Sequence, residues 1–171
     1  IQTFELQYAC LQFEDHMQGM QDAVPDFSKA LLHNQLLVDL NFFGCWLADS
    51  GLLIIIQSLH DHPALMKLSL RHNRGRTASL RALGRFLSSP TCTLSCLDFS
   101  VEFVRFFDSS PSLTIAILVQ EVEQNNYLEH LGLSSNHLSN DDLASLFLLL
   151  VLYTLLLSHG TPDHSLCRPF L

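Results

Sequence analysis

The sequence is poor in charged residues, and basic residues are the scarcer kind. Of its 171 residues only 15% are charged, and 9 Lys and Arg stand against 17 Asp and Glu, for a formal charge of −8. Proteins that bind nucleic acid or an anionic membrane usually carry a patch of basic residues for that purpose. We therefore expect neither nucleic acid nor a membrane among the partners of this chain.

The usual marks of a secreted or zinc-binding protein are also missing. The 5 cysteines are odd in number, their spacings fit no zinc pattern, and no N-x-S/T acceptor for glycosylation occurs. No secretory signal precedes Ile1, although a fragment could have lost one. Together these features favour a reducing setting, so we expect a cytoplasmic, intracellular protein.

Motifs of common catalytic sites do not occur either. The sequence has no G-x-S-x-G nucleophile elbow, no Walker loop and no dinucleotide fingerprint. The histidine-rich residues 60–62 precede Pro63 without a further ligand at a recognisable spacing, so we interpret them as a solvated turn. Cys45 is expected to be a structural turn thiol, whereas Cys96 occupies an outward strand position where a thiol could react. We predict no enzyme activity, no cofactor, no metal and no small-molecule substrate.

What the sequence does contain is leucine at regular intervals. Residues 128–138 read LEHLGLSSNHL, an L-x-x-L-x-L-x-x-N-x-L pattern. Leu131 and Leu133 are two residues apart, so they point to the same side of a short strand. Asn136 follows where the strand ends, and its side chain can bond backbone groups that the turn leaves unpaired.

The same pattern recurs four times upstream. The further segments start at residues 1, 37, 65 and 94 and read IQTFELQYACL, LVDLNFFGCWL, LMKLSLRHNRG and LSCLDFSVEFV. Ala9, Cys45 and Glu102 replace the asparagine in three of them, and Gly75 replaces the last leucine of another. Consecutive starts are separated by 36, 28, 29 and 34 residues.

Five such segments in one phase resemble leucine-rich repeats, and spacings of 28 and 29 resemble the ribonuclease-inhibitor class. The resemblance implies an α/β horseshoe, a solenoid with short parallel strands on its concave side and helices on its convex side. We expect a repeat domain over residues 1–150. Because the chain starts inside a repeat, we expect a fragment of a longer array. The alternative is an all-helical protein in which the leucine spacing is accidental.

Helices are expected between the strands. Apolar residues at helical spacing predict a helix over residues 12–24 that ends at Pro25, followed by a short helix capped by Asp26. In the third repeat, Leu80, Leu83 and Leu87 form the expected buried stripe. The caps predicted for the later helices are Asp49 or Ser50, Thr77, Ser110, and Ser139 or Asn140.

The chain closes with an uncharged stretch and a tail. Residues 143–157 carry no charge, but they are fewer than the ~20 that a membrane-spanning helix needs, so we interpret them as a buried repeat helix. The last residues, SHGTPDHSLCRPFL, do not return to the pattern. We assign residues 151–171 to an irregular or truncated tail.

The outward strand positions would line the concave face, where we expect a partner to bind. Phe43 is a large aromatic residue at a position that should face solvent, and aromatic and arginine side chains are common in interface hot spots. The alternative is that these are ordinary surface residues that pair across strands. The candidate partner-binding residues are Glu5, Tyr8, Asp39, Asn41, Phe43, Lys67, Arg71, His72, Asp98 and His130.

These observations predict a non-catalytic scaffold that binds another protein through its concave face. The sequence does not name that partner. One alternative is a GTPase-activating regulator resembling the Ran type, which shares this repeat class and would use Arg74 or Arg76. The other is a membrane-tethered repeat protein anchored by residues 143–157.

Overall fold

The chain alternates short strands with helices. The computed structural model describes residues 2–5, 23–100, 118, 121, 122, 125, 127–136 and 138–158. In chain order its elements are β1 (Thr3–Glu5), α1 (Ala23–His33), β2 (Asp39–Asn41), α2 (Ala48–Ser58), β3 (Lys67–Ser69), α3 (Thr77–Leu87), β4 (Cys96–Asp98), β5 (His130–Gly132) and α5 (Asn140–Ser158).

The five strands form one parallel sheet in the order β1-β2-β3-β4-β5. Each strand begins at the third residue of one of the five predicted segments, and those third residues are paired directly across the sheet. The predicted α/β class and parallel strands are therefore confirmed. The paired third residues are Thr3, Asp39, Lys67, Cys96 and His130.

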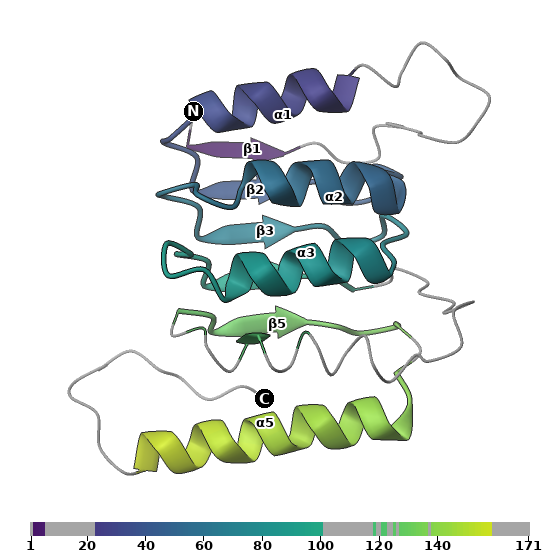
Figure 1. Ribbon diagram of the computed structural model, residues 1–171, viewed down its shortest axis with the longest axis vertical. Coiled ribbons are helices and arrows are strands. Elements are labelled where there is room, and N and C mark those ends of the chain that lie inside the picture. Colours follow the sequence, from purple (N-terminus) through teal and green to yellow (C-terminus); the bar gives the residue numbers. More distant parts are fainter. Residues whose placement is uncertain are drawn as a thin grey trace.

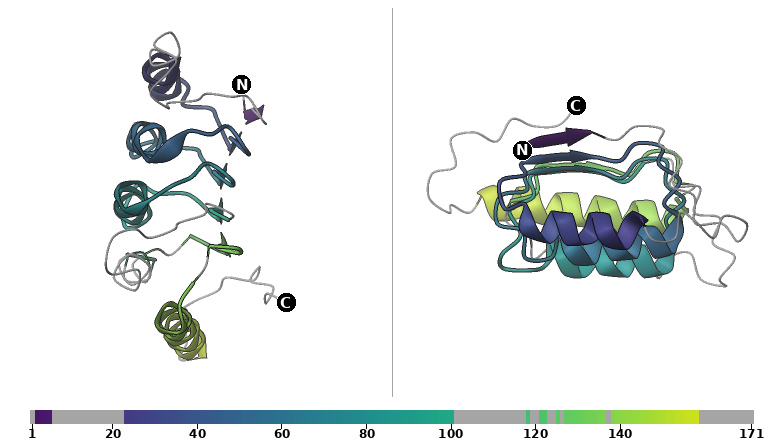
Figure 2. Two further views of the ribbon diagram at one scale, coloured as in Figure 1. Left: turned by 90° about the vertical axis from the view of Figure 1, so that its right-hand side faces the viewer. Right: turned by 90° about the horizontal axis from the view of Figure 1, so that it is seen from above.

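The helices lie on one side of the sheet. Figure 1 shows the strands one below another with the helices in front of them, and Figure 2 shows the strands and the helices as two separate layers. Parallel strands need such crossover connections, because all of them start at the same end of the sheet and the chain must return to that end before each new strand. We call the side of the sheet opposite α1, α2, α3 and α5 the open face.

The core lies between the two layers. The fourth and sixth residues of the inner segments point toward the helices, and each is at most 1% exposed. The predicted stripe of α3 is buried against them, as are Ile55 and Ile56 of α2. The buried strand-side residues are Leu40, Phe42, Leu68, Leu70, Leu97 and Phe99.

Gly75 departs from the leucine pattern for a reason that lies in the next segment. A Cβ atom on Gly75 would lie 2.5 Å from Cζ of Phe99, a distance at which one of the two must move. Phe99 is itself larger than the leucine of the pattern and is fully buried. The larger side chain in one segment therefore fills the volume that the smaller residue leaves in its neighbour.

The two pattern asparagines that the structure describes bond to neighbouring turns. Asn73 is fully buried; its Nδ2 donates to the Phe42 and Leu70 carbonyls, and its Oδ1 accepts from the Leu47 N–H. Asn136 is also buried and donates to the Phe99 carbonyl at 2.6 Å. Each amide thus satisfies backbone groups of the adjacent segment, as predicted for this position.

Three expectations about helix boundaries are wrong. Pro25 lies inside α1, within its first turn, where no intrahelical N–H bond is required of it. Asp49 does not cap its own helix α2, which has no side-chain cap. Its Oδ1 instead accepts from the N–H groups of Arg76 at 2.7 Å and Ser79 at 3.0 Å, at the start of α3. Thr77 is consequently the first residue of α3 and not its cap.

The last helix is only partly as predicted. Ser139 caps α5 together with Asp142, as expected, and the helix continues to Ser158. Residues 151–158 are therefore helical and not irregular. The helix is not buried as predicted, because Leu143, Phe147 and Leu148 are 52–68% exposed. Within the described part of the chain, no helix combines the length and apolar character needed to cross a membrane.

Some predictions lie outside the described residues. These are the helix over residues 12–22, the cap at Ser110 and the tail after Ser158. Of the helix predicted to follow Ser110, residues 118, 121 and 122 are described, and they are helical.

Candidate functional site

The open face carries one pair of opposite charges in its first row of paired residues. Asp39 of β2 pairs directly with Lys67 of β3, and Lys67 pairs with Cys96 of β4. Lys67 is exposed, whereas Asp39 and Cys96 are half-buried. Of the predicted residues at the two ends of the sheet, Glu5 and His130 are exposed, and Tyr8 lies outside the described residues.

Asn41 and Asp98, two further predicted binding residues, have a local structural role. The Oδ1 of Asn41 accepts from the Phe43 N–H at 2.9 Å, and the Oδ1 of Asp98 accepts from the Ser100 N–H at 3.0 Å. Such a side-chain bond to the backbone two residues on fixes the exit of a strand. These two side chains therefore shape the strand ends that follow them.

At the ends of β2 and β3, three predicted partner-binding residues come together with Trp46, which the sequence analysis missed, and with Arg74, which it named only for the GTPase-activating alternative. The Arg71 guanidinium lies 5.3 Å from the centre of the Phe43 ring, and the Arg74 guanidinium lies 4.0 Å from that of Trp46. The centre of the His72 ring lies 6.3 Å from that of Phe43 and 6.0 Å from that of Trp46. We call Phe43, Trp46, Arg71, His72 and Arg74 the aromatic–arginine cluster.

An unusual backbone holds this cluster in place. Trp46, His72 and Arg74 all have left-handed backbone angles, with φ between 55° and 63°. Bulky residues rarely adopt this conformation, and the surroundings must stabilise it. Here the Gly44 N–H donates to the Arg71 carbonyl, and the buried Asn73 amide bonds Phe42 and Leu47 of the preceding segment as well as Leu70 of its own. The cluster is therefore presented by two turns that are fixed to each other.

The cluster is locally cationic in an acidic chain. Residues 71–76 read RHNRGR, so three of the chain's 9 basic side chains lie within six positions. Asp49, three residues after Trp46, already accepts hydrogen bonds from two N–H groups at the start of α3. Arg71 is exposed and has no carboxylate partner among the described residues. The arrangement offers aromatic surface next to guanidinium groups.

Cys96, the thiol singled out from the sequence, is not activated. Burial raises the pKa of its thiol; nearby Lys67 lowers that pKa, and Asp98 and Asp39 raise it. A raised pKa leaves less of the reactive thiolate at neutral pH. Burial also raises the pKa of Cys92, which lies in the core.

The histidines at 60 and 62 have different surroundings, so the predicted solvated turn is only half right. His60 is exposed and lies 3.2 Å from the Asp61 carboxylate. His62 is buried, and its Nε2 bonds the Asn34 carbonyl at 2.5 Å, which ties this turn to the end of α1. Within the described ranges no three His, Cys, Asp or Glu side chains are grouped as metal ligands.

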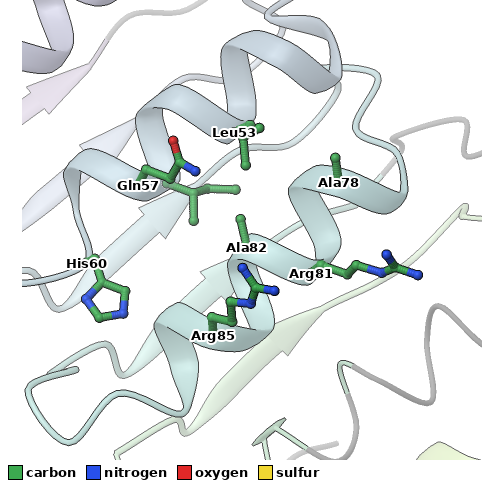
Figure 3. Close-up of a pocket in the computed structure, with 8 residues that line it drawn as sticks. Leu53, Gln57, His60, Ala78, Arg81, Ala82 and Arg85 are labelled. Atoms are coloured by element: carbon green, nitrogen blue, oxygen red, sulfur yellow. The ribbon is translucent and has the colours of Figure 1, made fainter.

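A shallow hollow of about 500 Å³ lies between α2 and α3 on the helix side. Figure 3 shows Gln57 and Leu53 on one wall and Ala82 and Arg85 on the other, with Arg81 pointing away from α2. No phenylalanine, tyrosine or tryptophan lines the hollow, and none of its lining residues belongs to the cluster. Its two arginines are useful as matched controls for the cluster.

The chain is therefore an α/β protein with one layer of helices on one side of its sheet. The strands of the open face lead into the turns that carry the aromatic–arginine cluster. No protein-family model and no curated protein matches the sequence. Among solved structures, the chain resembles "Leiomodin-1 Actin-Binding Site 2 (ABS2)", with a TM-score of 0.61 and 17% sequence identity. The similarity covers 91% of this chain and 83% of that one, and at this identity it concerns the fold alone.

Proposed function

We propose that this chain is a non-catalytic protein-recognition module that binds its partner through the open face and the turns at the strand ends. The observation that carries the proposal is the aromatic–arginine cluster. Tryptophan, tyrosine and arginine dominate the energetic centres of protein interfaces, because each combines a large contact area with a polar group. Here such residues are already stacked and held by fixed turns, which lowers the entropy that binding must overcome.

We further propose that the array is a leucine-rich repeat solenoid of the ribonuclease-inhibitor class, with the open face as the inside of a horseshoe. Support comes from the five strands, which begin at the same position of each predicted segment. It also comes from the two pattern asparagines that bond the neighbouring turns. In such a stack, the open face presents one row of side chains from every repeat.

Actin is the first defined protein to test as a partner, because the structural neighbour is an actin-binding site. Co-sedimentation with filamentous actin, and pull-down of monomeric actin, would measure this directly. If neither binds, affinity capture from a cell lysate extends the search to other proteins. Recognition through the cluster does not depend on actin being that partner.

The deciding experiment compares two variants of the full chain on whichever partner binds. Phe43→Ala with Arg71→Ala removes one half of the cluster, and Arg81→Ala with Arg85→Ala removes two exposed arginines from the helix side. We expect the first variant to lose binding by at least about tenfold, because hot-spot truncations cost ~2 kcal/mol or more. The second should bind normally, with circular dichroism confirming that both fold. Equal binding by the first variant would remove the cluster from the site.

The GTPase-activating alternative is less well supported. Arg74 lies over Trp46, and the Arg76 N–H belongs to the bonds that start α3, so both positions have a local structural role. Stimulated GTP hydrolysis that disappears in Arg74→Ala would favour this alternative over simple binding.

A further inference from the structure

Two surfaces on the helix side of the molecule are complementary in apolar character and in charge. One is the exposed side of the last helix, α5, and the other is the hollow between α2 and α3. We infer that α5 of one copy docks into the α2–α3 hollow of a second copy, so that the chain self-associates through its helix side. This contact uses neither the open face nor the aromatic–arginine cluster, and it goes beyond the proposed function.

The exposed side of α5 is apolar. Leu143, Phe147 and Leu148 are 52%, 68% and 58% exposed, and Ala144 beside them is exposed as well. Their helical spacing places them on one broad side of α5, which lies at the end of the row of helices in Figure 1. Contiguous apolar surface of this kind marks a contact site more often than it marks ordinary surface.

The register of the sheet shows what normally covers this side of a helix. The first residues of β2 and β5 stand in the same row of paired residues, 91 positions apart. The residues 91 positions before Leu143 and Phe147 are Leu52 and Ile56 of α2, which are 0% and 1% exposed. Ile56 lines the hollow where α2 meets α3. The corresponding side of α5 therefore has the side chains of a helix–helix contact.

The hollow between α2 and α3 offers a matching surface. Its volume of about 500 Å³ is in the usual range for a binding pocket. Leu53 and Ile56 of α2 and the small side chains of Ala78 and Ala82 of α3 form its apolar part, and Figure 3 shows Ala82 pointing toward the α2 side. Small residues four positions apart lie on the same side of α3 and allow another helix to approach closely.

The two surfaces carry opposite charges. The helix α3 contains Arg81 and Arg85 and no acidic residue, whereas α5 contains Asp141 and Asp142 and no basic residue. Both arginines are exposed, and neither forms an ion pair with a described residue. Asp141 is exposed three positions before Ala144, on the apolar side of α5. Docking of this side in the hollow brings its carboxylate toward the arginines, whose N–H groups can bond it.

A lipid surface is the competing partner for an exposed apolar helix side. Helices that lie on membranes usually carry basic residues on their polar face, next to the anionic headgroups. The helix α5 has no basic residue and begins with two acidic ones, which an anionic bilayer would repel. The hollow provides apolar contact and positive charge together, so it fits α5 better than a bilayer does.

The inferred contact joins two different surfaces, so it is heterologous. A second copy bound in this way still presents its own α5 or hollow, and assembly continues into open chains unless the rotation closes a ring. Because the apolar area is small, we expect a weak contact with a dissociation constant above about 10 µM. At lower concentrations the chain is monomeric, and Arg81 and Arg85 remain valid control positions for binding at the open face.

Sedimentation of the full chain over about 1–500 µM measures the self-association directly, and we expect the average mass to rise with concentration. Phe147→Ser removes the apolar centre of α5, and the hollow variant, Arg81→Glu with Arg85→Glu, reverses the charge beside the hollow. Each should weaken self-association by at least about tenfold, with circular dichroism confirming that both fold. The matched control, Lys67→Glu with Arg71→Glu on the open face, makes the same change of charge and should associate like the wild type.

Mixing the two weakened variants gives the sharpest test, because each keeps the surface that the other has lost. The α5 of the hollow variant can still dock into the intact hollow of the Phe147→Ser chain. We therefore expect the mixture to form a complex with one copy of each variant and no larger species. Charge reversal gives a second test: adding Asp141→Arg to the hollow variant should restore part of its self-association.

Four results would overturn the inference: a wild type that stays monomeric over this range, a Phe147→Ser chain that associates normally, a mixture without a complex, or equal weakening in the control. A monomeric chain that sediments with vesicles of phosphatidylcholine and phosphatidylserine, and loses this binding with Phe147→Ser, would assign α5 to a lipid surface instead. None of these results bears on the proposed function, which is tested at the open face with Phe43→Ala and Arg71→Ala.

Discussion

Residues 37–100 and residues 128–158 follow the same sequence pattern, yet their side chains are buried to different degrees. Leu68 of β3 and Leu70 just after that strand are at most 1% exposed, whereas Leu131 of β5 and Leu133 just after that strand are only half-buried. The difference follows from position in the sheet. β3 has a strand on each side, but β5 is last in the strand order.

The comparison shows that the pattern supplies apolar side chains and that neighbours on both sides bury them. A single strand–helix unit cannot cover its own leucines, so its stability depends on stacking. The same sequence signal should therefore contribute differently to folding in the two regions. Matched substitutions can test this.

The largest difference is expected between two phenylalanines on helices. Phe86 of α3 is 1% exposed and Phe147 of α5 is 68% exposed. Phe86→Ala should lower the free energy of unfolding by about 3–5 kcal/mol, because it leaves a cavity in the core. Phe147→Ala should stay within about 0.5 kcal/mol of wild type. Urea denaturation followed by circular dichroism measures both, and similar losses would mean that α5 is covered in solution.

Two glycines provide the next comparison. A Cβ on Gly75 meets Cζ of the buried Phe99 ring, whereas a Cβ on Gly132 of β5 first meets Oδ1 of the half-buried Asp98 at 2.8 Å. Asp98 is a short, partly accessible side chain that can rotate if it gives up its bond to the Ser100 N–H, whereas the Phe99 ring is enclosed. Gly75→Ala should therefore cost about 1–3 kcal/mol through overpacking, and Gly132→Ala should cost at most about 1 kcal/mol, the usual value of one lost hydrogen bond.

The glycine comparison has an internal control. The double variant Gly75→Ala with Phe99→Leu should recover part of the stability that Gly75→Ala alone loses. The smaller leucine side chain makes room for the added methyl group. Thermal unfolding of the single and double variants would show it. Additive losses in the double variant would separate Gly75 from Phe99 and leave the departure from the leucine pattern unexplained.

The strand positions were the most predictable part of this fold. Apolar residues two apart must point the same way in a strand, so their phase is written directly in the sequence. Contacts between segments leave no such trace. Gly75 looked like a defect because the compensating Phe99 belongs to the next segment. Asp49 was assigned to its own helix because the start of α3 is distant in sequence and adjacent only after folding.

The candidate site was less predictable than the fold. Strand alternation indicated Phe43 and Arg71, but it stops where the strands end, and Trp46 and Arg74 lie beyond that point. One signal was available: Trp46 and Arg74 are each the tenth residue of consecutive segments. Their left-handed backbone and their stacking depend on the turn bonds made by Asn73 and Gly44, which periodicity does not encode.

A smaller effect is expected for two aspartates that are each the second residue of a helix. Asp49 of α2 accepts two N–H groups at the start of α3, whereas Asp141 of α5 is exposed. Asp49→Ala should cost about 1 kcal/mol, the usual value for a lost cap. Asp141→Ala should change stability by less than about 0.5 kcal/mol. Chemical denaturation would resolve the two, and an equal loss would mean that α5 caps a following element.

The smallest expected effect lies at the boundary between the regions. Cys96 of β4 pairs with Lys67 on its inner side and with His130 on its outer side. Lys67 lowers the thiol pKa, so Lys67→Gln should raise that pKa and slow alkylation of Cys96 by about twofold at mildly alkaline pH. His130→Gln should leave the rate unchanged. Iodoacetamide labelling resolved by peptide mass spectrometry measures this, with buried Cys92 as an internal reference. Equal slowing by both substitutions would show that β5 influences the open face as strongly as β3 does, and the distinction between inner and last strands would then hold for the core alone.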